Sequence, residues 1–328
     1  MPKPLISLDI GENYYDPREF VEATVYGEEL GFKRLWFGDH FMPWYHTSDR
    51  SSFVWSVMAS ALERTKKVEL GPLVTTPIGA RYHPALIAQA AATLDNMYPG
   101  RFLMSVGSGE AVNEVPFWND RWPKWSERME RLCEGITLMQ KLWTSKKPFA
   151  FKGKYFSSEF LLLYTKPRTK LDIYFSAVGE KAAYNAGRYG DHLVTLSPGN
   201  SAERIRDVLL PRFREGQKEA KKKTAGGLVV HVDFAFKTPA QIIKDAPYEL
   251  SPFAENAVDI RTPIELEKAG RGVTAERLSR FTHSVKNWGE LVKKLDEYTQ
   301  VGASELILFS APVKKEMEAV AKNVLSVF

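Results

Sequence analysis

The chain has 328 residues, of which 44% are hydrophobic and 26% charged, so it can bury a large core and lacks the composition of a disordered protein. Its 45 basic and 40 acidic side chains give a formal net charge of +5, an imbalance too small to indicate a nucleic-acid partner. The single cysteine, Cys133, excludes an intramolecular disulfide and any thiolate metal cluster within the chain.

The sequence also lacks the features of an exported or membrane protein. No apolar stretch reaches the length of a membrane span, and residues Met1 to Leu5 have neither the basic nor the long apolar region of a secretory signal. We therefore expect a cytoplasmic protein with no membrane partner.

Short apolar runs alternate with amphipathic segments of helical length, which predicts βα units and a parallel sheet. The expected strands are Leu5–Ile10, Arg34–Phe37, Val68–Leu73, Phe102–Val106, Leu171–Ala177, Leu193–Ser197, Leu228–Ala235 and Glu305–Ser310. Eight such units in a chain of this length predict an α/β protein of the (β/α)8 TIM-barrel type. A doubly wound sheet is the alternative.

Two stretches exceed what a minimal barrel needs. Residues 144–170 contain a small predicted strand pair, Phe149–Phe151 and Gly153–Phe156, and residues 237–286 form a long insertion after the seventh strand. Excursions of this length usually serve as lids or binding loops. We expect one barrel domain over residues 1–328, with the insertion inside it.

Polar side chains follow the predicted strands where each strand ends. Asp39 and His40 end the second apolar run, and Trp44 stands four residues further on. Because the carboxyl ends of all barrel strands meet at one face, this acid, imidazole and indole indicate chemistry as well as packing. A histidine after a strand can instead fill a crevice, and that structural interpretation remains open at this point.

Common catalytic motifs are missing. The turn from Gly107 to Glu110 lacks the third glycine of a dinucleotide fingerprint and the Lys-Ser/Thr of a P-loop, so the motif does not indicate nicotinamide or nucleotide phosphate binding. The six histidines show no metal-binding spacing, and no G-x-S-x-G elbow follows a strand. We therefore expect no catalytic metal and no serine nucleophile.

Several motifs in order along the chain carry a family resemblance. They are Gly38–Trp44, Thr76–Pro77, Arg81–Pro84, Leu86–Gln89, Tyr98–Arg101, Gly107–Glu114 and Ala186–Asp191. Together they resemble the luciferase-like flavin and deazaflavin oxidoreductases, and within them the branch of coenzyme F420-dependent dehydrogenases that act on glucose 6-phosphate or on secondary alcohols. The similarity extends from Leu5 to the last strand.

This resemblance implies a homodimeric barrel, with an insertion after strand seven, that binds coenzyme F420 in its mouth. It also implies a non-proline cis peptide at Leu73–Val74 that braces the cofactor ring. The cofactor-binding positions would be Asp39, Leu73, Val74, Thr76, Ser108, Gly109, Asn113, Val178 and Gly179.

The resemblance further assigns catalytic roles to His40, Trp44 and Glu110. Oxidation of an alcohol removes a proton from oxygen as hydride leaves carbon, and an imidazole with an ordinary pKa of about 6.5 can take that proton. His40 is the expected base. Glu110, kept protonated by burial, would supply a proton beside the cofactor ring, and Trp44 would wall the pocket.

The substrate positions depart from the sugar-phosphate branch. Gly199 stands where those members have a phosphate-binding lysine, and Asn13 stands where they have a glutamate. Lys268 lies in a segment that resembles their second phosphate-binding segment, and Arg280 lies close to their third cationic position. We expect a small hydroxyl compound as substrate, with a sugar phosphate slightly ahead of a simple secondary alcohol because the segment around Lys268 is kept.

Two other functions remain open from the sequence. Distant relatives on this barrel are FMN-dependent monooxygenases, and some carry a cofactor without turnover. The identity of the bound chromophore distinguishes the first, and the joint presence of His40, Trp44 and Glu110 argues against the second.

Overall fold

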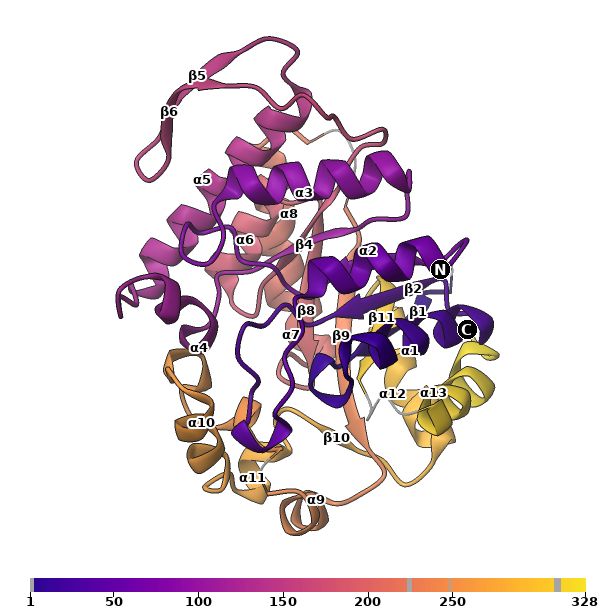
Figure 1. Ribbon diagram of the computed structural model, residues 1–328. Helices are drawn as coiled ribbons and strands as arrows, with labels where there is room; N and C mark the ends of the chain where they lie inside the picture. Colours follow the sequence, from indigo (N-terminus) through magenta and orange to yellow (C-terminus); the bar gives the residue numbers. More distant parts are fainter. Residues whose placement is uncertain (1–2, 223–225, 248, 310–313) are drawn as a thin grey trace.

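The computed structural model describes residues 3–222, 226–247, 249–309 and 314–328. Within these residues, eight parallel strands stand in the order β3-β2-β1-β11-β9-β8-β7-β4, with helices packed around them (Figure 1). The strands are β1 (Leu5–Ile10), β2 (Arg34–Phe37), β3 (Glu69–Pro72), β4 (Met104–Val106), β7 (Ile173–Ser176), β8 (His192–Ser197), β9 (Leu228–Ala235) and β11 (Ala303–Phe309).

The two end strands of this order also meet, so the sheet closes on itself. Parallel bridges join Leu70 to Phe102 and Thr75 to Val106, and the Gly107 amide donates to the Thr75 carbonyl at 3.0 Å. The fold is therefore the expected (β/α)8 barrel, and the doubly wound alternative is wrong. Closure leaves no free edge and brings the carboxyl ends of all eight strands to one mouth.

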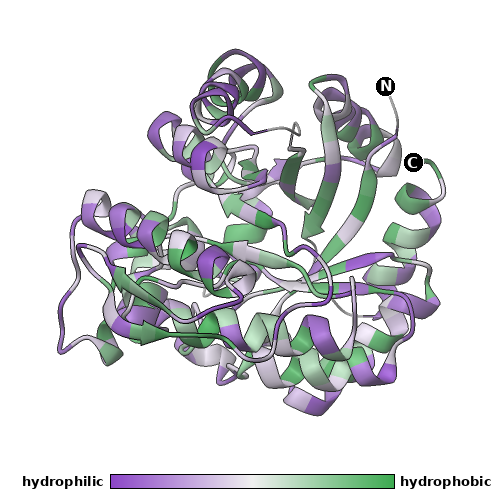
Figure 2. Ribbon diagram, turned by 90° about the horizontal axis from the view of Figure 1, so that it is seen from above, coloured by the Kyte–Doolittle hydropathy of each residue, from purple (hydrophilic) through white to green (hydrophobic). Residues whose placement is uncertain are grey.

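Helices cover the outside of the barrel. The main ones are α1 (Pro17–Glu29), α2 (Val54–Arg64), α3 (Pro84–Met97), α5 (Trp125–Thr144), α6 (Glu180–Tyr189), α8 (Leu210–Glu219), α12 (Trp288–Gln300) and α13 (Lys314–Val320). Apolar residues concentrate on the strands, and the helices carry much of the polar surface (Figure 2). Proline begins both α1 and α3, a position that needs no amide donor. No helix in the described residues is both long and apolar enough to cross a membrane.

The strand bounds follow the expected ones closely. The first, second and seventh strands have the predicted limits, and the others differ by one or two residues at their ends. The expected end of the last strand at Ser310 lies outside the described residues. Cys133 is buried on α5, as its helical pattern predicted.

The prediction for the small hairpin was wrong in its second strand. β5 (Phe149–Lys152) pairs with β6 (Ser157–Leu161), and residues 153–156 form the turn between them. The reason lies in α5, where the Glu134 carboxylate accepts the backbone amides of Lys154, Tyr155 and Phe156. Those amides are therefore not available to a strand partner.

The residues between β9 and α12 are mainly helical. They contain α9 (Pro239–Asp245), α10 (Pro263–Gly270), α11 (Ala275–Leu278) and the short β10 (His283–Ser284), which pairs with β9. The three helices lie together below the barrel in Figure 1. Leu250, Leu266 and Leu278 form a buried cluster with Val112 of α4 (Ala111–Glu114), and Trp44 packs against it. This segment therefore contacts the loops that follow β2 and β4.

A buried carboxylate ties the strands together at the opposite end of the barrel. Glu305, which is 1% exposed, accepts hydrogen bonds from Ser7 Oγ and Trp36 Nε1, both at 2.7 Å, and pairs with Arg34. Arg34 also binds Glu69. A buried charge is tolerated when it is paired and hydrogen-bonded in this way, and the network joins β1, β2, β3 and β11.

Helices α6 and α8 approach closely through two glycines. A Cβ atom added at Gly187 would lie 2.0 Å from the Phe213 carbonyl oxygen, and one at Gly216 would lie 2.1 Å from that of Tyr184. Backbone atoms form both contacts, so they cannot move aside as a side-chain tip can. The small residue is required at each position by the packing of the two helices.

We predict that Gly187→Ala destabilises the protein by about 2 kcal/mol, because overpacking outweighs the gain in helix propensity. Urea unfolding followed by circular dichroism measures the change. Gly289→Ala on α12 is the matched control, since its added Cβ meets only Asn287 Oδ1 at 3.3 Å. Equal stability of the Gly187→Ala and wild-type proteins would contradict the close packing.

Candidate active site

A cavity of about 190 Å³ opens at the carboxyl ends of the barrel strands. It is lined by Asp9, Asp39, His40, Leu73, Val74, Thr76, Gly109, Glu110, Asn113, Glu114, Ser176, Val194, Leu196 and His231. Most of the sequence-predicted cofactor positions belong to this set. The cavity therefore lies where a barrel enzyme carries its chemistry.

His40 faces a carboxylate and an indole. Its Nε2 lies 3.5 Å from Glu110 Oε2, and its ring meets that of Trp44 edge to face at a centroid distance of 5.5 Å. The side chain of His40 is 13% exposed and that of Glu110 is 27% exposed. The imidazole thus packs against Trp44, lies next to the acidic side chain of Glu110 and lines the cavity.

Asn113 couples the loop after β2 to the loop after β4. Its Oδ1 accepts the amides of Phe41 at 2.8 Å and Met42 at 3.2 Å, and its Nδ2 donates to Glu110 Oε2 at 3.1 Å. One amide side chain therefore orients both the segment that carries His40 and the carboxylate beside it. Asn113 acts here as a positioning residue, whatever further contact it makes with a ligand.

Asp39, the residue before His40, is buried, and both of its carboxylate oxygens have partners. Thr75 Oγ1 donates to its Oδ2 at 2.5 Å, Tyr82 OH donates to its Oδ1 at 3.0 Å, and Arg81 Nη2 lies 3.0 Å from Oδ1. Arg81 also donates to the Asp39 carbonyl at 2.6 Å. These contacts satisfy a charge that would otherwise be costly to bury.

Glu114 is a second buried acid on the same side of the cavity. Its residue exposure is 0%, and its Oε2 accepts the Arg81 amide at 3.1 Å. Its Oε1 has no hydrogen-bond partner among the described residues, and neither has Arg81 Nε, 4.0 Å away. Burial raises the pKa of Glu114 to about 7, against the opposing effect of Arg81. The motif analysis gave this residue no role.

The floor of the cavity is shaped by small residues and an unusual peptide. The bond Leu73–Val74 is cis, as the family resemblance implied, and both residues line the cavity. An added Cβ at Gly107 would lie 2.4 Å from Val74 Cγ2. Gly109 has a φ of 80°, a conformation that favours glycine, and an added Cβ there would lie 2.8 Å from the methyl group of Thr76.

The cavity lining contains a second imidazole–carboxylate pair, which the sequence analysis did not identify. His231 Nε2 on β9 lies 3.1 Å from Asp9 Oδ2 on β1. Asp233, two residues after His231, is also placed inside the barrel, and burial raises its pKa to about 7 while a hydrogen bond with Thr282 opposes the shift. The period-two alternation of His231 and Asp233 within an apolar strand was the available signal.

Other predicted cofactor positions lie outside the cavity lining. Val178 is 51% exposed, and Gly179 precedes α6 with open space where a Cβ would stand. The Asn200 amide donates to the Val178 carbonyl at 3.2 Å. Ser108 lies between the two glycines of the β4 turn and is half-buried. These residues form a rim that continues from the cavity to a helix N-terminus, where backbone amides favour anions.

The predicted substrate residues do not converge on the cavity. Lys268 is exposed in the last turn of α10, and the side chain of Arg280 is 66% exposed and paired with Glu276. The carbonyl of Asn13 accepts a hydrogen bond from Ser48 Oγ at 3.1 Å. None of the three is in the lining of the described cavity.

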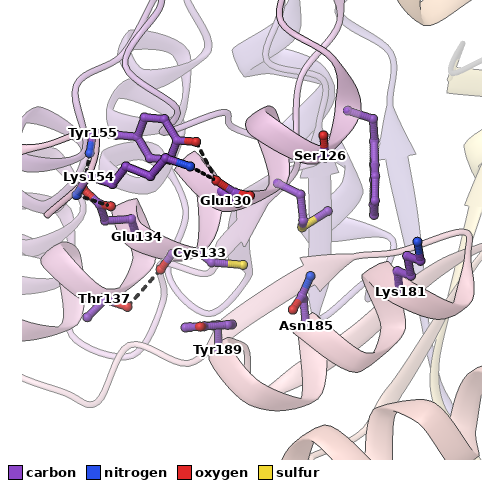
Figure 3. A pocket seen from close by; sticks show the side chains of 12 residues that line it. Ser126, Glu130, Cys133, Glu134, Thr137, Lys154, Tyr155, Lys181, Asn185 and Tyr189 are labelled. Atoms are coloured by element: carbon purple, nitrogen blue, oxygen red, sulfur yellow. Dashed lines mark hydrogen bonds and ion pairs between the residues drawn. The ribbon is translucent and has the colours of Figure 1, made fainter.

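A larger hollow of about 560 Å³ lies between α5, α6 and the β5–β6 turn (Figure 3). Several of its polar side chains form hydrogen bonds within the hollow. Glu130 accepts hydrogen bonds from Lys154 Nζ and Tyr155 OH, and Thr137 donates to the Cys133 carbonyl. Burial raises the pKa of Cys133 to about 12, so its thiol is a poor nucleophile. This hollow attaches the hairpin and contains no histidine among its lining residues.

The described residues contain no group of three His, Cys, Asp or Glu side chains that could hold a metal ion. A closed barrel with imidazole and carboxyl groups converging at its mouth is the architecture of a (β/α)8-barrel enzyme. A model of the luciferase-like monooxygenase family matches residues 6–305. The chain therefore belongs to the luciferase-like monooxygenase family.

The chain is also similar to individual proteins whose activities are named. The chain is 33% identical to an F420-dependent glucose-6-phosphate dehydrogenase of Intrasporangium calvum, over 90% of this chain and 89% of that protein. It is 34% identical to the enzyme of the same name from Segniliparus rotundus, over 91% and 89%. A solved F420-dependent secondary alcohol dehydrogenase, in complex with an F420-acetone adduct, is 31% identical over the whole of both chains, with a TM-score of 0.91.

The raised pKa of Asp233 predicts a pH effect on stability. The folded state holds a proton that the unfolded carboxyl releases near pH 4, so stability is lost as pH rises toward 7. We expect Asp233→Asn to reduce this loss by at most about 2 to 3 kcal/mol between pH 5 and pH 8. Urea unfolding at both pH values measures it. The exposed control Asp245→Asn should keep the wild-type slope, and an unchanged slope in Asp233→Asn would contradict the assignment.

Proposed function

We propose that this protein is a coenzyme F420-dependent dehydrogenase that oxidises a small hydroxyl compound by hydride transfer to the deazaflavin. The observation that carries the proposal is the meeting of His40, Glu110 and Trp44 at the barrel mouth, in a chain similar along nearly its whole length to F420-dependent dehydrogenases. The proposed enzyme is an oxidoreductase that acts on CH-OH donors.

The residues at the mouth fit the cofactor. Leu73, Val74 and Thr76 would support the ring from one side, Asp39 and Asn113 would add polar contacts, and Gly109 would form part of the same surface. Ser108, Val178 and Gly179 would hold the acidic tail, because Gly179 is the N-cap of α6 and the first amides of a helix favour anions. When bound, the deazaflavin supplies a two-electron acceptor for hydride.

Residues of the chain itself accept the proton of the substrate hydroxyl and stabilise the resulting charge. His40 takes the substrate hydroxyl proton, and the Glu110 carboxylate 3.5 Å from Nε2 stabilises the imidazolium that results. Trp44 packs edge to face on the imidazole and would limit its position, although it is not in the lining of the described cavity. Because 27% of the Glu110 side chain is exposed, we propose the role of imidazolium partner for it in place of the neutral acid that the resemblance implied.

The substrate remains one of two classes, a sugar phosphate or a secondary alcohol. The relatives named as glucose-6-phosphate dehydrogenases support the first. Against it, Gly199 provides no cation, and Lys268 and Arg280 are both exposed. We therefore place a neutral alcohol ahead of a phosphorylated sugar, which reverses the order expected from the sequence. Asn13 remains a proposed hydroxyl contact.

The proposal also covers the assembly and the surroundings of the enzyme. We propose a homodimer in the cytoplasm, with one barrel domain over residues 1–328 and an insertion at residues 237–286. An FMN-dependent monooxygenase is the alternative function, since the family is described as luciferase-like monooxygenases. A cofactor-binding barrel without turnover is a third possibility, and it makes no use of His40 as a base.

We predict that coenzyme F420 binds at least about tenfold more tightly than FMN, since the rim residues suit its acidic tail. Isothermal titration calorimetry of the purified protein with each cofactor measures the two dissociation constants. Equal or tighter FMN binding, with oxygen consumption in the presence of reduced FMN, would move the assignment to the monooxygenases.

We predict that His40→Ala lowers kcat by about 10²-fold or more and leaves F420 affinity nearly unchanged, because a general base contributes about 10² to 10⁴ to the rate. Glu110→Gln should also slow turnover, by a smaller factor, since it removes the charge beside the imidazolium. Stopped-flow reduction of F420 and a parallel binding titration test both variants. Wild-type turnover in His40→Ala would remove that residue from the mechanism.

Lys268→Ala separates the two substrate classes. If a sugar phosphate is turned over, the substitution should raise its KM at least about tenfold, equivalent to 1.4 kcal/mol, and barely affect an uncharged alcohol. Gly199→Lys is the matched gain variant, because the nearest atoms to its Cβ lie 3.8 Å or more away. It should lower the KM of sugar phosphates only. No effect of either variant on a phosphorylated substrate would exclude these positions from phosphate binding.

A further inference from the structure

Three carboxyl groups lie together in one part of the cavity lining, and a guanidinium outside the lining contacts two of them. Asp39, Glu110 and Glu114 all line the cavity, and Arg81 is the cation that faces Asp39 and Glu114. Asp39 takes the strong contacts of Arg81, one to its carboxylate at 3.0 Å and one to its carbonyl at 2.6 Å. Glu114 receives the Arg81 backbone amide and stands 4.0 Å from the guanidinium.

Glu114 therefore has less compensation for a negative charge than either neighbour. Its side chain is 1% exposed, whereas that of Glu110 is 27% exposed and lies beside His40. Its Oε1 is buried and has no hydrogen-bond partner in the described part of the chain. A buried carboxyl oxygen without a donor is better satisfied when it carries a proton and donates it to an acceptor.

Its position also fits a ligand contact. Glu114 lines the same cavity as Thr76 and Gly109, and the Glu114 Cγ atom lies 3.1 Å from the place where a Cβ of Gly109 would stand. Gly109 therefore packs closely against Thr76 and the stem of Glu114, which holds this side chain at the cavity that the ring of a bound cofactor would occupy. The geometry thus combines a buried, unpartnered oxygen with an adjacent cavity.

We propose that Glu114, and not Glu110, is the neutral acid of this site, and that its carboxyl donates a hydrogen bond to an oxygen or nitrogen acceptor of the bound deazaflavin. This inference rests on the proposed function for the identity of the ligand. The protonation of Glu114 in the ligand-free protein does not depend on it. Glu110 keeps the separate role of a charged neighbour of His40.

The titration of this acid is set by its surroundings. Burial raises its pKa to about 7, Arg81 opposes that shift, and the charges of Asp39 and Glu110 support it. Ionisation would remove the donor and place a negative charge against the ligand. Cofactor binding should therefore weaken as pH rises above 7, by up to about tenfold per pH unit for one linked proton.

The first experiment uses the ligand-free protein. Infrared difference spectra across pH 5.5 to 8.5 should contain the carbonyl band of a protonated carboxyl that disappears near pH 7. Because burial also raises the pKa of Asp233 to about 7, the spectra are recorded on the Asp233→Asn protein as well, and its remaining band should be absent once Glu114→Gln is added. It should remain in the control Glu110→Gln with its midpoint at lower pH, because one negative neighbour is gone. A wild-type protein without any such titrating band would overturn the proposal, and so would an Asp233→Asn protein in which no band titrates near pH 7.

The second experiment is a fluorescence titration with coenzyme F420 over the same pH range. Glu114→Gln keeps a donor and cannot ionise, so its dissociation constant should stay within about threefold of the wild-type value at pH 6 and should not change with pH. Glu110→Gln should retain the pH dependence. A Glu114→Gln protein that follows the wild-type pH dependence, or that binds about tenfold more weakly at every pH, would refute a neutral donor. Absence of F420 binding in all proteins would instead reject the proposed function.

Discussion

The buried carboxylate of Asp39 is the constraint on which the candidate site depends. It stands at the end of β2, and its partners Thr75, Tyr82 and Arg81 come from the chain between β3 and α3. A charge in this position would cost several kcal/mol without those contacts, so the loops must form together. Arg81 extends the unit to Glu114 after β4. The direction of His40, the next residue after Asp39, follows from this network.

A second support comes from outside the barrel. The helices between β9 and α12 form a small apolar core with Val112, and Met42 and Trp44 pack against it. Glu267 of α10 accepts both the amide and the hydroxyl of Thr47, at 2.9 and 2.8 Å. The loop after β2 is thus held on the barrel side by the contacts of Asp39, and on its other side by the apolar core and by Glu267. Such double support is what a preorganised imidazole requires.

The charged residues in the cavity lining indicate which ligand charges the cavity can accept. Its described lining contains Asp9, Asp39, Glu110 and Glu114 with two imidazoles, and no lysine or arginine. Electrostatic attraction for an anionic substrate would have to come from the rim, where α6 begins. This arrangement suits a ligand whose negative charge lies at one end, outside the barrel, and whose uncharged ring and reaction partner lie inside.

The sequence by itself determined the strands, their number and most residues of the mouth. Period-two and apolar runs identified each strand, because a fully buried parallel strand needs them, and the motifs around Asp39, Thr76 and Gly109 placed polar groups at the strand ends. Only the tertiary structure decided which acid is buried. Glu110 and Glu114 are four residues apart on one short segment, but Glu114 is buried against Arg81 of another loop, whereas Glu110 lies beside His40 and stays partly exposed. The pairing of Asp9 with His231 and the exposure of Lys268 were equally beyond the sequence, because each depends on contacts between segments far apart in the chain.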